Sequence, residues 1–164
     1  MTIHFNADEI FEIAEQIENN GARFYRRAAQ GKDEKTQQLL LDLAGMEETH
    51  FATFEKLREA LTKLEWRPSG DADGQSVQYL RSIADGHIFD AKADPAAKLT
   101  GDETLADILN IAIKLEKDSV IFYQELRQIV PERLGKFRID HIVGEEMRHI
   151  VALSEQLAAL KPKP

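Results

Sequence analysis

The 164-residue sequence contains no cysteine, which excludes disulfide bonds, thiolate catalysis, iron–sulfur clusters and cysteine-ligated metal sites. It also has no apolar run near the about 18 residues that a membrane-spanning helix needs. The first residues form neither a basic nor an apolar segment, so we expect no secretory signal and a cytoplasmic protein. The net charge of −8 argues against nucleic acid or an anionic membrane as a partner.

Apolar residues recur at helical spacing over most of the chain. The pattern predicts four long helices, at about 8–30, 34–64, 102–130 and 131–160. Capping residues are expected at Asp33 for the second helix and at Asp102 or Thr100 for the third, because short polar side chains accept hydrogen bonds from free backbone N–H groups. Pro131 is expected in the first turn of the fourth helix, where its missing N–H carries no penalty.

The lengths of the connections predict the topology. Only a few residues separate the first helix from the second and the third from the fourth, so each pair forms an antiparallel hairpin. The connection at about 65–101 is much longer and contains a short helical pattern at about 76–84. Two hairpins joined by one long crossover predict an all-α four-helix bundle that spans 1–164 as a single domain.

One motif occurs twice, about a hundred residues apart. Glu18-Asn-Asn-Gly-Ala-Arg-Phe-Tyr25 corresponds to Glu116-Lys-Asp-Ser-Val-Ile-Phe-Tyr123. Each copy is followed, at nearly the same distance, by Glu-x-x-His. Positions i and i+3 share one face of a helix, so the Glu and the His of each pair point the same way. The predicted ligand set is Glu18, Glu47, His50, Glu116, Glu146 and His149.

Four carboxylates and two imidazoles are suited to iron, manganese or zinc. Four glutamates brought together inside a bundle without a cation would repel one another and take up protons. Carboxylates can also bridge two ions. We therefore predict a site for two metal ions, with iron as the first candidate and manganese or zinc as alternatives.

The repeat separates these ligands from nearby acidic residues. Glu15, Glu48 and Glu145 correspond to Ile113, Met147 and Met46, so we assign them to solvated positions or to positions around the ligands. His87, in the crossover, and His141 have no histidine counterpart in the repeat and are expected to be structural rather than metal ligands.

Tyr25 and Tyr123 each follow a predicted ligand glutamate by two helical turns. Their hydroxyls either bond a ligand carboxylate or a bound oxygen species, or they are ordinary core aromatics with any nearby partner.

These motifs resemble the rubrerythrin group of the ferritin-like superfamily over the whole chain. The resemblance implies a ferritin-like bundle with a non-haem di-iron site that reduces oxygen species, with electrons from an external donor such as a rubredoxin-like protein. It also implies a small oligomer, expected here to be a homodimer. There are two departures: the chain lacks the cysteines of a rubredoxin domain, and Ser119 stands where rubrerythrins carry a further glutamate. The second departure resembles the centres of bacterioferritin-type proteins.

Three functions are consistent with this reading. The first is an oxidoreductase that reduces hydrogen peroxide or dioxygen. The second is a ferroxidase or iron-handling protein, which would require a cage-like oligomer. The third is a non-catalytic module that uses a metal ion for stability. Hydroxylation of an organic substrate is chemically possible, but no motif indicates it.

Overall fold

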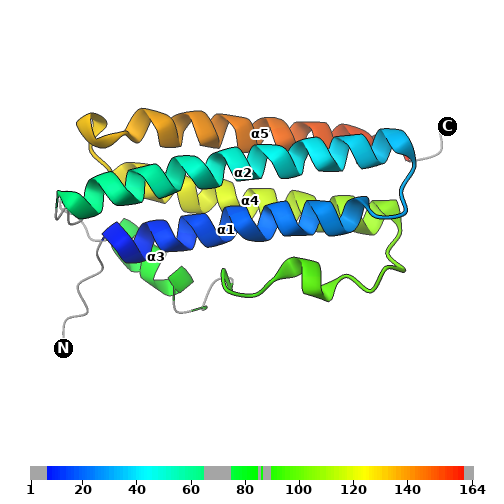
Figure 1. Cartoon of the computed structure of the whole chain (residues 1–164), viewed down its shortest axis with the longest axis horizontal. Coiled ribbons are helices and arrows are strands. Elements are labelled where there is room, and N and C mark those ends of the chain that lie inside the picture. The colour runs from blue at the N-terminus through cyan, green and yellow to red at the C-terminus, as the bar shows by residue number, and fades with distance from the viewer. Residues whose placement is uncertain (1–6, 65–74, 85, 87–89, 161–164) are drawn as a thin grey trace.

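The computed structural model describes residues 7–64, 75–84, 86 and 90–160. Four long helices lie side by side and form a bundle, as Figure 1 shows. They are α1 (Ala7–Ala29), α2 (Glu34–Lys63), α4 (Leu105–Ile129) and α5 (Lys136–Ala159). The helix α1 packs mainly on α2, and α4 packs mainly on α5. The predicted all-α bundle of two antiparallel hairpins is confirmed.

The described part of the crossover, residues 75–84 and 90–104, lies along the outside of the bundle (Figure 1). It includes the short helix α3 (Gln75–Ala84), close to the predicted 76–84, and the 3₁₀ turn η1 (Pro95–Lys98), which the sequence did not indicate. Two side chains of α1 hold the stretch around η1. Asn20 donates from Nδ2 to the carbonyl oxygens of Ala91 at 2.7 Å and Ala93 at 3.2 Å, and Arg23 pairs with Asp94 at 2.6 Å.

Two helix starts differ from the prediction. The helix α4 begins at Leu105 rather than near 102, because Thr104 and Asp107 form a capping box in which each side chain accepts from the backbone N–H of the other. The helix α5 begins at Lys136 rather than at 131. Pro131 precedes a separate 3₁₀ turn, η2 (Glu132–Leu134), and Gly135 then adopts a left-handed φ of 105°, which interrupts the helix. The predicted cap at Asp33 is confirmed.

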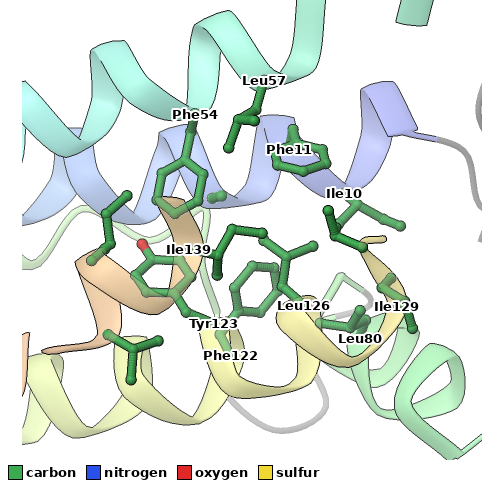
Figure 2. Packing of buried hydrophobic residues seen from close by; sticks show 14 of the residues in the cluster. Ile10, Phe11, Phe54, Leu57, Leu80, Phe122, Tyr123, Leu126, Ile129 and Ile139 are labelled. Atoms are coloured by element: carbon green, nitrogen blue, oxygen red, sulfur yellow. The ribbon is translucent and has the colours of Figure 1, made fainter. Parts of the chain in front are cut away.

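The core of the bundle consists of two apolar clusters. One cluster contains Phe11, Phe54 and Tyr123, together with Leu80 from α3. Figure 2 shows this packing, in which the rings of Phe54 and Tyr123 lie 4.8 Å apart between centroids. The other cluster includes Phe24 and Leu109. Among the described helices, none is long and apolar enough to cross a membrane.

A layer of buried polar residues lies between the two clusters along each long helix. On α2, for example, Leu43 belongs to one cluster and Phe54 to the other, and Glu47 and His50 lie between them in sequence. On α1, α4 and α5, the predicted ligands likewise lie in sequence between residues of one cluster and residues of the other. The bundle therefore places carboxylates and imidazoles at its centre, between two apolar clusters.

Candidate metal centre

All four long helices contribute to the polar layer. The six predicted ligands are at most 3% exposed. They form two overlapping groups whose potential ligand atoms all lie within 4.8 Å of one another. One group is Glu18, Glu47, His50 and Glu146, and the other is Glu47, Glu116, Glu146 and His149. Glu47 and Glu146 belong to both groups, so their carboxylates are placed to bridge two ions.

The imidazoles face the carboxylates through their Nδ1 atoms. Nδ1 of His50 lies 3.0 Å from Oε1 of Glu146 and 3.4 Å from Oε2 of Glu18. Nδ1 of His149 lies 3.0 Å from Oε2 of Glu146 and 3.5 Å from an oxygen of both Glu47 and Glu116. The two imidazole rings are nearly parallel, with centroids 5.9 Å apart.

Close as they are, many of these atoms make no hydrogen bond. Glu18 Oε2, Glu47 Oε1, both oxygens of Glu146 and both Nδ1 atoms are buried without a hydrogen-bond partner. Buried polar atoms are rarely left without a partner, because the loss costs about 1–3 kcal/mol each. These atoms converge on a common space and are all electron-pair donors. The donor set therefore fits two metal cations.

The two tyrosines link the two copies of the motif. The hydroxyl of Tyr25 donates to Oε1 of Glu116, and the hydroxyl of Tyr123 donates to Oε1 of Glu18. Each tyrosine therefore bonds the predicted ligand glutamate of the other copy. Burial, reinforced by the nearby carboxylates, raises the pKa of both phenols well above its ordinary value, so both remain hydrogen-bond donors.

Burial dominates the electrostatics of the metal-free cluster. It raises the pKa of Glu18, Glu47 and Glu116 well above the ordinary value, and repulsion between the carboxylates adds to this. Burial also opposes the charged form of Glu146, but the two imidazoles, whose Nδ1 atoms each lie 3.0 Å from one of its oxygens, outweigh it and lower the pKa of that carboxyl.

The carboxylates have the opposite effect on the two imidazoles. Burial favours the neutral ring, but Glu116, Glu146 and Glu47 together raise the pKa of His149 to about 12. The pKa of His50 is also raised, chiefly by Glu146 against the effect of burial. Without a metal ion, protons therefore supply the positive charge that the cluster requires, and binding of a cation would displace them.

The two imidazoles differ on their outer side. Nε2 of His50 donates to Oε2 of Glu145 at 2.9 Å. A carboxylate can only accept this bond, so Nε2 carries the proton and the Nδ1 lone pair of the neutral ring is free for a metal ion. Nε2 of His149 is buried and has no hydrogen-bond partner. The sequence assigned Glu145 either to a solvated position or to a position around the ligands. The structure shows that it contacts His50.

The remaining candidates lie outside the ligand set. Glu15 is nearly buried rather than solvated and pairs with Arg58 at 2.8 Å. Glu48 is exposed and pairs with Arg26. His141 is 70% exposed and contacts Glu145 at 3.2 Å, so it does not reach the cluster. His87 lies outside the described residues.

The comparisons with known proteins agree with this geometry. The chain is similar to a crystal structure from Thermotoga maritima, described as that of a ferritin-like diiron-carboxylate protein, with a TM-score of 0.69. The two are 25% identical, and the match covers 94% of this chain and 96% of the other. The fold is that of the ferritin-like di-iron proteins. No family model matches the chain, and neither does any curated protein. This similarity extends to the ferritin-like superfamily and is not specific to rubrerythrins.

Proposed function

We propose that this protein is a non-haem di-iron oxidoreductase that reduces hydrogen peroxide or dioxygen. Glu18, Glu47, His50, Glu116, Glu146 and His149 hold two iron ions. When bound, two ferrous ions supply two electrons that, with two protons, convert hydrogen peroxide to two water molecules or dioxygen to hydrogen peroxide. An external one-electron donor of the rubredoxin type returns the oxidised ions to the ferrous state. The donor is external because a chain without cysteine carries no thiolate-bound iron of its own.

The observation that carries this proposal is the set of buried donor atoms without hydrogen-bond partners. They belong to residues of α1, α2 and α5, and together with Glu116 of α4 these residues divide into two groups that share Glu47 and Glu146. Carboxylate and imidazole ligands suit iron, manganese and zinc alike. The similarity to a protein described as diiron-carboxylate favours iron.

The surrounding residues hold the ligands in place. Tyr25 and Tyr123 each donate to one oxygen of a ligand carboxylate and so fix the orientation of that carboxylate. Glu145 fixes the ring of His50 through Nε2. Such outer partners orient metal ligands, and a carboxylate that accepts from a ligand imidazole also raises the basicity of that ring.

Metal analysis combined with a redox assay tests the proposal. We expect two iron ions per chain after anaerobic loading with ferrous iron, and oxidation of both when hydrogen peroxide is added. His149→Ala should retain one ion and lose most of its peroxide-dependent turnover, whereas Glu48→Ala, on the exposed face of α2, should behave as the unmodified protein. A single zinc ion per chain, or no ion after loading, would contradict the proposal.

A second candidate function is iron oxidation for storage. It is favoured by Ser119, which leaves a symmetric set of four glutamates and two histidines, as in bacterioferritin-type centres. Storage requires a cage-like assembly with an internal cavity, whereas we propose a homodimer for the oxidoreductase. Light scattering of the purified protein separates the two: a dimer supports the oxidoreductase, and a large spherical oligomer supports storage.

A further inference from the structure

A cavity of about 160 Å³ adjoins one side of the candidate centre. Its buried lining includes Tyr25, Glu47 and Glu116, and its exposed lining includes Lys98 and Lys114. It therefore runs from the surface, between α1, the crossover and α4, to two carboxylates of the centre.

Small residues keep the inner part of this cavity open. Gly21 and Ser119 occupy the same position in the two copies of the motif, one helical turn after Glu18 and Glu116, and both line the cavity. A Cβ atom at Gly21 would lie 2.9 Å from Oε2 of Glu47. The hydroxyl of Ser119 donates to the carbonyl oxygen of Leu115 at 3.0 Å, so it is already bonded within its own helix.

The outer wall of the cavity is held in place by α1. Ala91, Ala93 and Pro95 of the crossover line it. The bonds from Asn20 to the carbonyl oxygens of Ala91 and Ala93 fix this stretch against the helix. The cavity is thus built into the packed structure.

Its size and charge restrict what can enter. Pockets for organic ligands of drug size usually measure about 300–1,000 Å³, whereas a water molecule takes about 30 Å³ in the liquid. The cavity has room for a few molecules of the size of water or for one molecule of about six heavy atoms, since a cavity of about 150 Å³ can hold benzene. At its outer end, Lys98 and Lys114 are matched by Asp90 and Asp118, and Lys114 pairs with Asp118 at 2.7 Å. Glu47 and Glu116 lie at its inner end, so the cavity does not favour anions.

We propose that this cavity admits small, uncharged oxygen species, hydrogen peroxide or dioxygen, to the Glu47 and Glu116 side of the centre and excludes bulkier organic molecules. The proposal rests on the proposed function and adds to it the route and the size limit of the oxidant. Ser119 lines this route at its inner end, so the side chain at this position controls access.

Ser119→Leu tests the route, because a leucine at this position would fill the inner cavity. The matched control is Lys117→Leu, which adds the same side chain to the exposed face of α4. Reduced, iron-loaded protein is mixed with hydrogen peroxide, dioxygen, the bulkier cumene hydroperoxide or ferricyanide, an oxidant that needs no access to the centre. Binding of nitric oxide, a small uncharged ligand of ferrous iron, supplies a readout that is independent of turnover.

In the unmodified protein and in Lys117→Leu, we expect cumene hydroperoxide, which is too large for the cavity, to react far more slowly than hydrogen peroxide. In Ser119→Leu we expect two iron ions per chain and an unchanged rate with ferricyanide. The rate of nitric oxide binding should fall at least about tenfold, because packed interiors leave no space beside an added side chain. The rate of oxidation should fall to the same extent for whichever of hydrogen peroxide and dioxygen enters through the cavity. The separate rates with hydrogen peroxide and dioxygen identify that oxidant.

Unchanged rates in an iron-replete Ser119→Leu protein, or equal rates with the two peroxides in the unmodified protein, would overturn the proposal. If Ser119→Leu fails to fold or to bind iron, Ala93→Phe narrows the same cavity from the crossover wall and must give the same slowing. If hydrogen peroxide and dioxygen fail to oxidise the unmodified protein while nitric oxide binding still depends on the cavity, the proposed function fails and the access route stands.

Discussion

The two copies of the motif supply the same ligand types, yet their surroundings differ. The ring of His50 is held on its outer side by Glu145, whereas Nε2 of His149 is buried without a partner. In the repeat, Met46 corresponds to Glu145, and a methionine offers no carboxylate. The internal repeat has thus kept the atoms that face the metal ions and not the atom that supports the imidazole. The two halves of the centre should therefore hold their ions unequally.

We expect the largest effect on metal content from removing a carboxylate that both groups share, Glu47 or Glu146. Glu146→Ala removes a ligand from both groups, whereas Glu116→Ala removes one from the His149 group only. We expect Glu146→Ala to lose both ions and Glu116→Ala to lose one. Each loss should exceed the about 10- to 100-fold weakening that follows removal of an outer partner. Elemental analysis after loading and dialysis measures this. Two ions retained by Glu146→Ala would contradict the assignment of a bridging ligand.

The turns of the two hairpins extend the comparison to folding stability. Gly31 and Gly135 both have positive φ, 71° and 105°. A Cβ at Gly31 meets nothing within 4 Å, but at Gly135 it would lie 2.6 Å from Cδ2 of Leu57. We expect Gly31→Ala to cost about 1 kcal/mol through backbone strain and Gly135→Ala about 2–4 kcal/mol through strain and overpacking. Urea unfolding of the metal-free protein measures both, and equal costs would show that Leu57 moves aside.

Removing the outer partner of His50 should affect one ion. Glu145→Ala leaves all six ligands in place but frees the ring, so we expect the affinity for the ion bound by His50 to fall about 10- to 100-fold. The ion bound by His149 should be unaffected. Competition titration with cobalt separates the two affinities, and Glu48→Ala serves as the control because Glu48 is exposed. Equal weakening of both ions would show that the two halves are not independent.

We expect the smallest effect from removing one tyrosine hydroxyl, and this effect should differ between Tyr25 and Tyr123. Removal of either hydroxyl leaves a buried glutamate oxygen without its partner, a loss of about 1–3 kcal/mol. Tyr25 lines the cavity, where a water molecule can replace the hydroxyl, whereas Tyr123 is absent from the cavity lining and completely buried. In the metal-free protein, Tyr123→Phe should therefore reduce the free energy of unfolding more than Tyr25→Phe. The reverse order would show that the cavity does not hydrate this carboxylate.

Much of this centre could be predicted from the sequence because helical geometry is regular. A spacing of three residues places Glu47 beside His50 on any α-helix, and the repeat distinguishes Glu18 from its neighbour Glu15. The helix starts were predicted less well. Pro131 is compatible with a first helical turn, but the left-handed conformation of Gly135 beside Leu57 depends on tertiary packing.

The features around the ligands could not be predicted for the same reason. Glu145 contacts His50 across the interface between two helices, and no spacing along one helix determines such a contact. The cavity depends on how the crossover lies against α1, which is fixed by bonds from Asn20 to backbone oxygens. The sequence did contain one signal for the cavity, the small residues Gly21 and Ser119. These residues indicate a cavity only once it is known that the crossover packs over them.

A pair of ions at this position would also act as a cross-link in a chain that cannot form a disulfide. The ligands come from both hairpins, so bound metal would join segments about a hundred residues apart in the folded state. Any ligand that binds only the folded state stabilises it by an amount that grows with the logarithm of its free concentration. The folded population of this protein would then follow the supply of metal in its surroundings, independently of any reaction that the metal carries out.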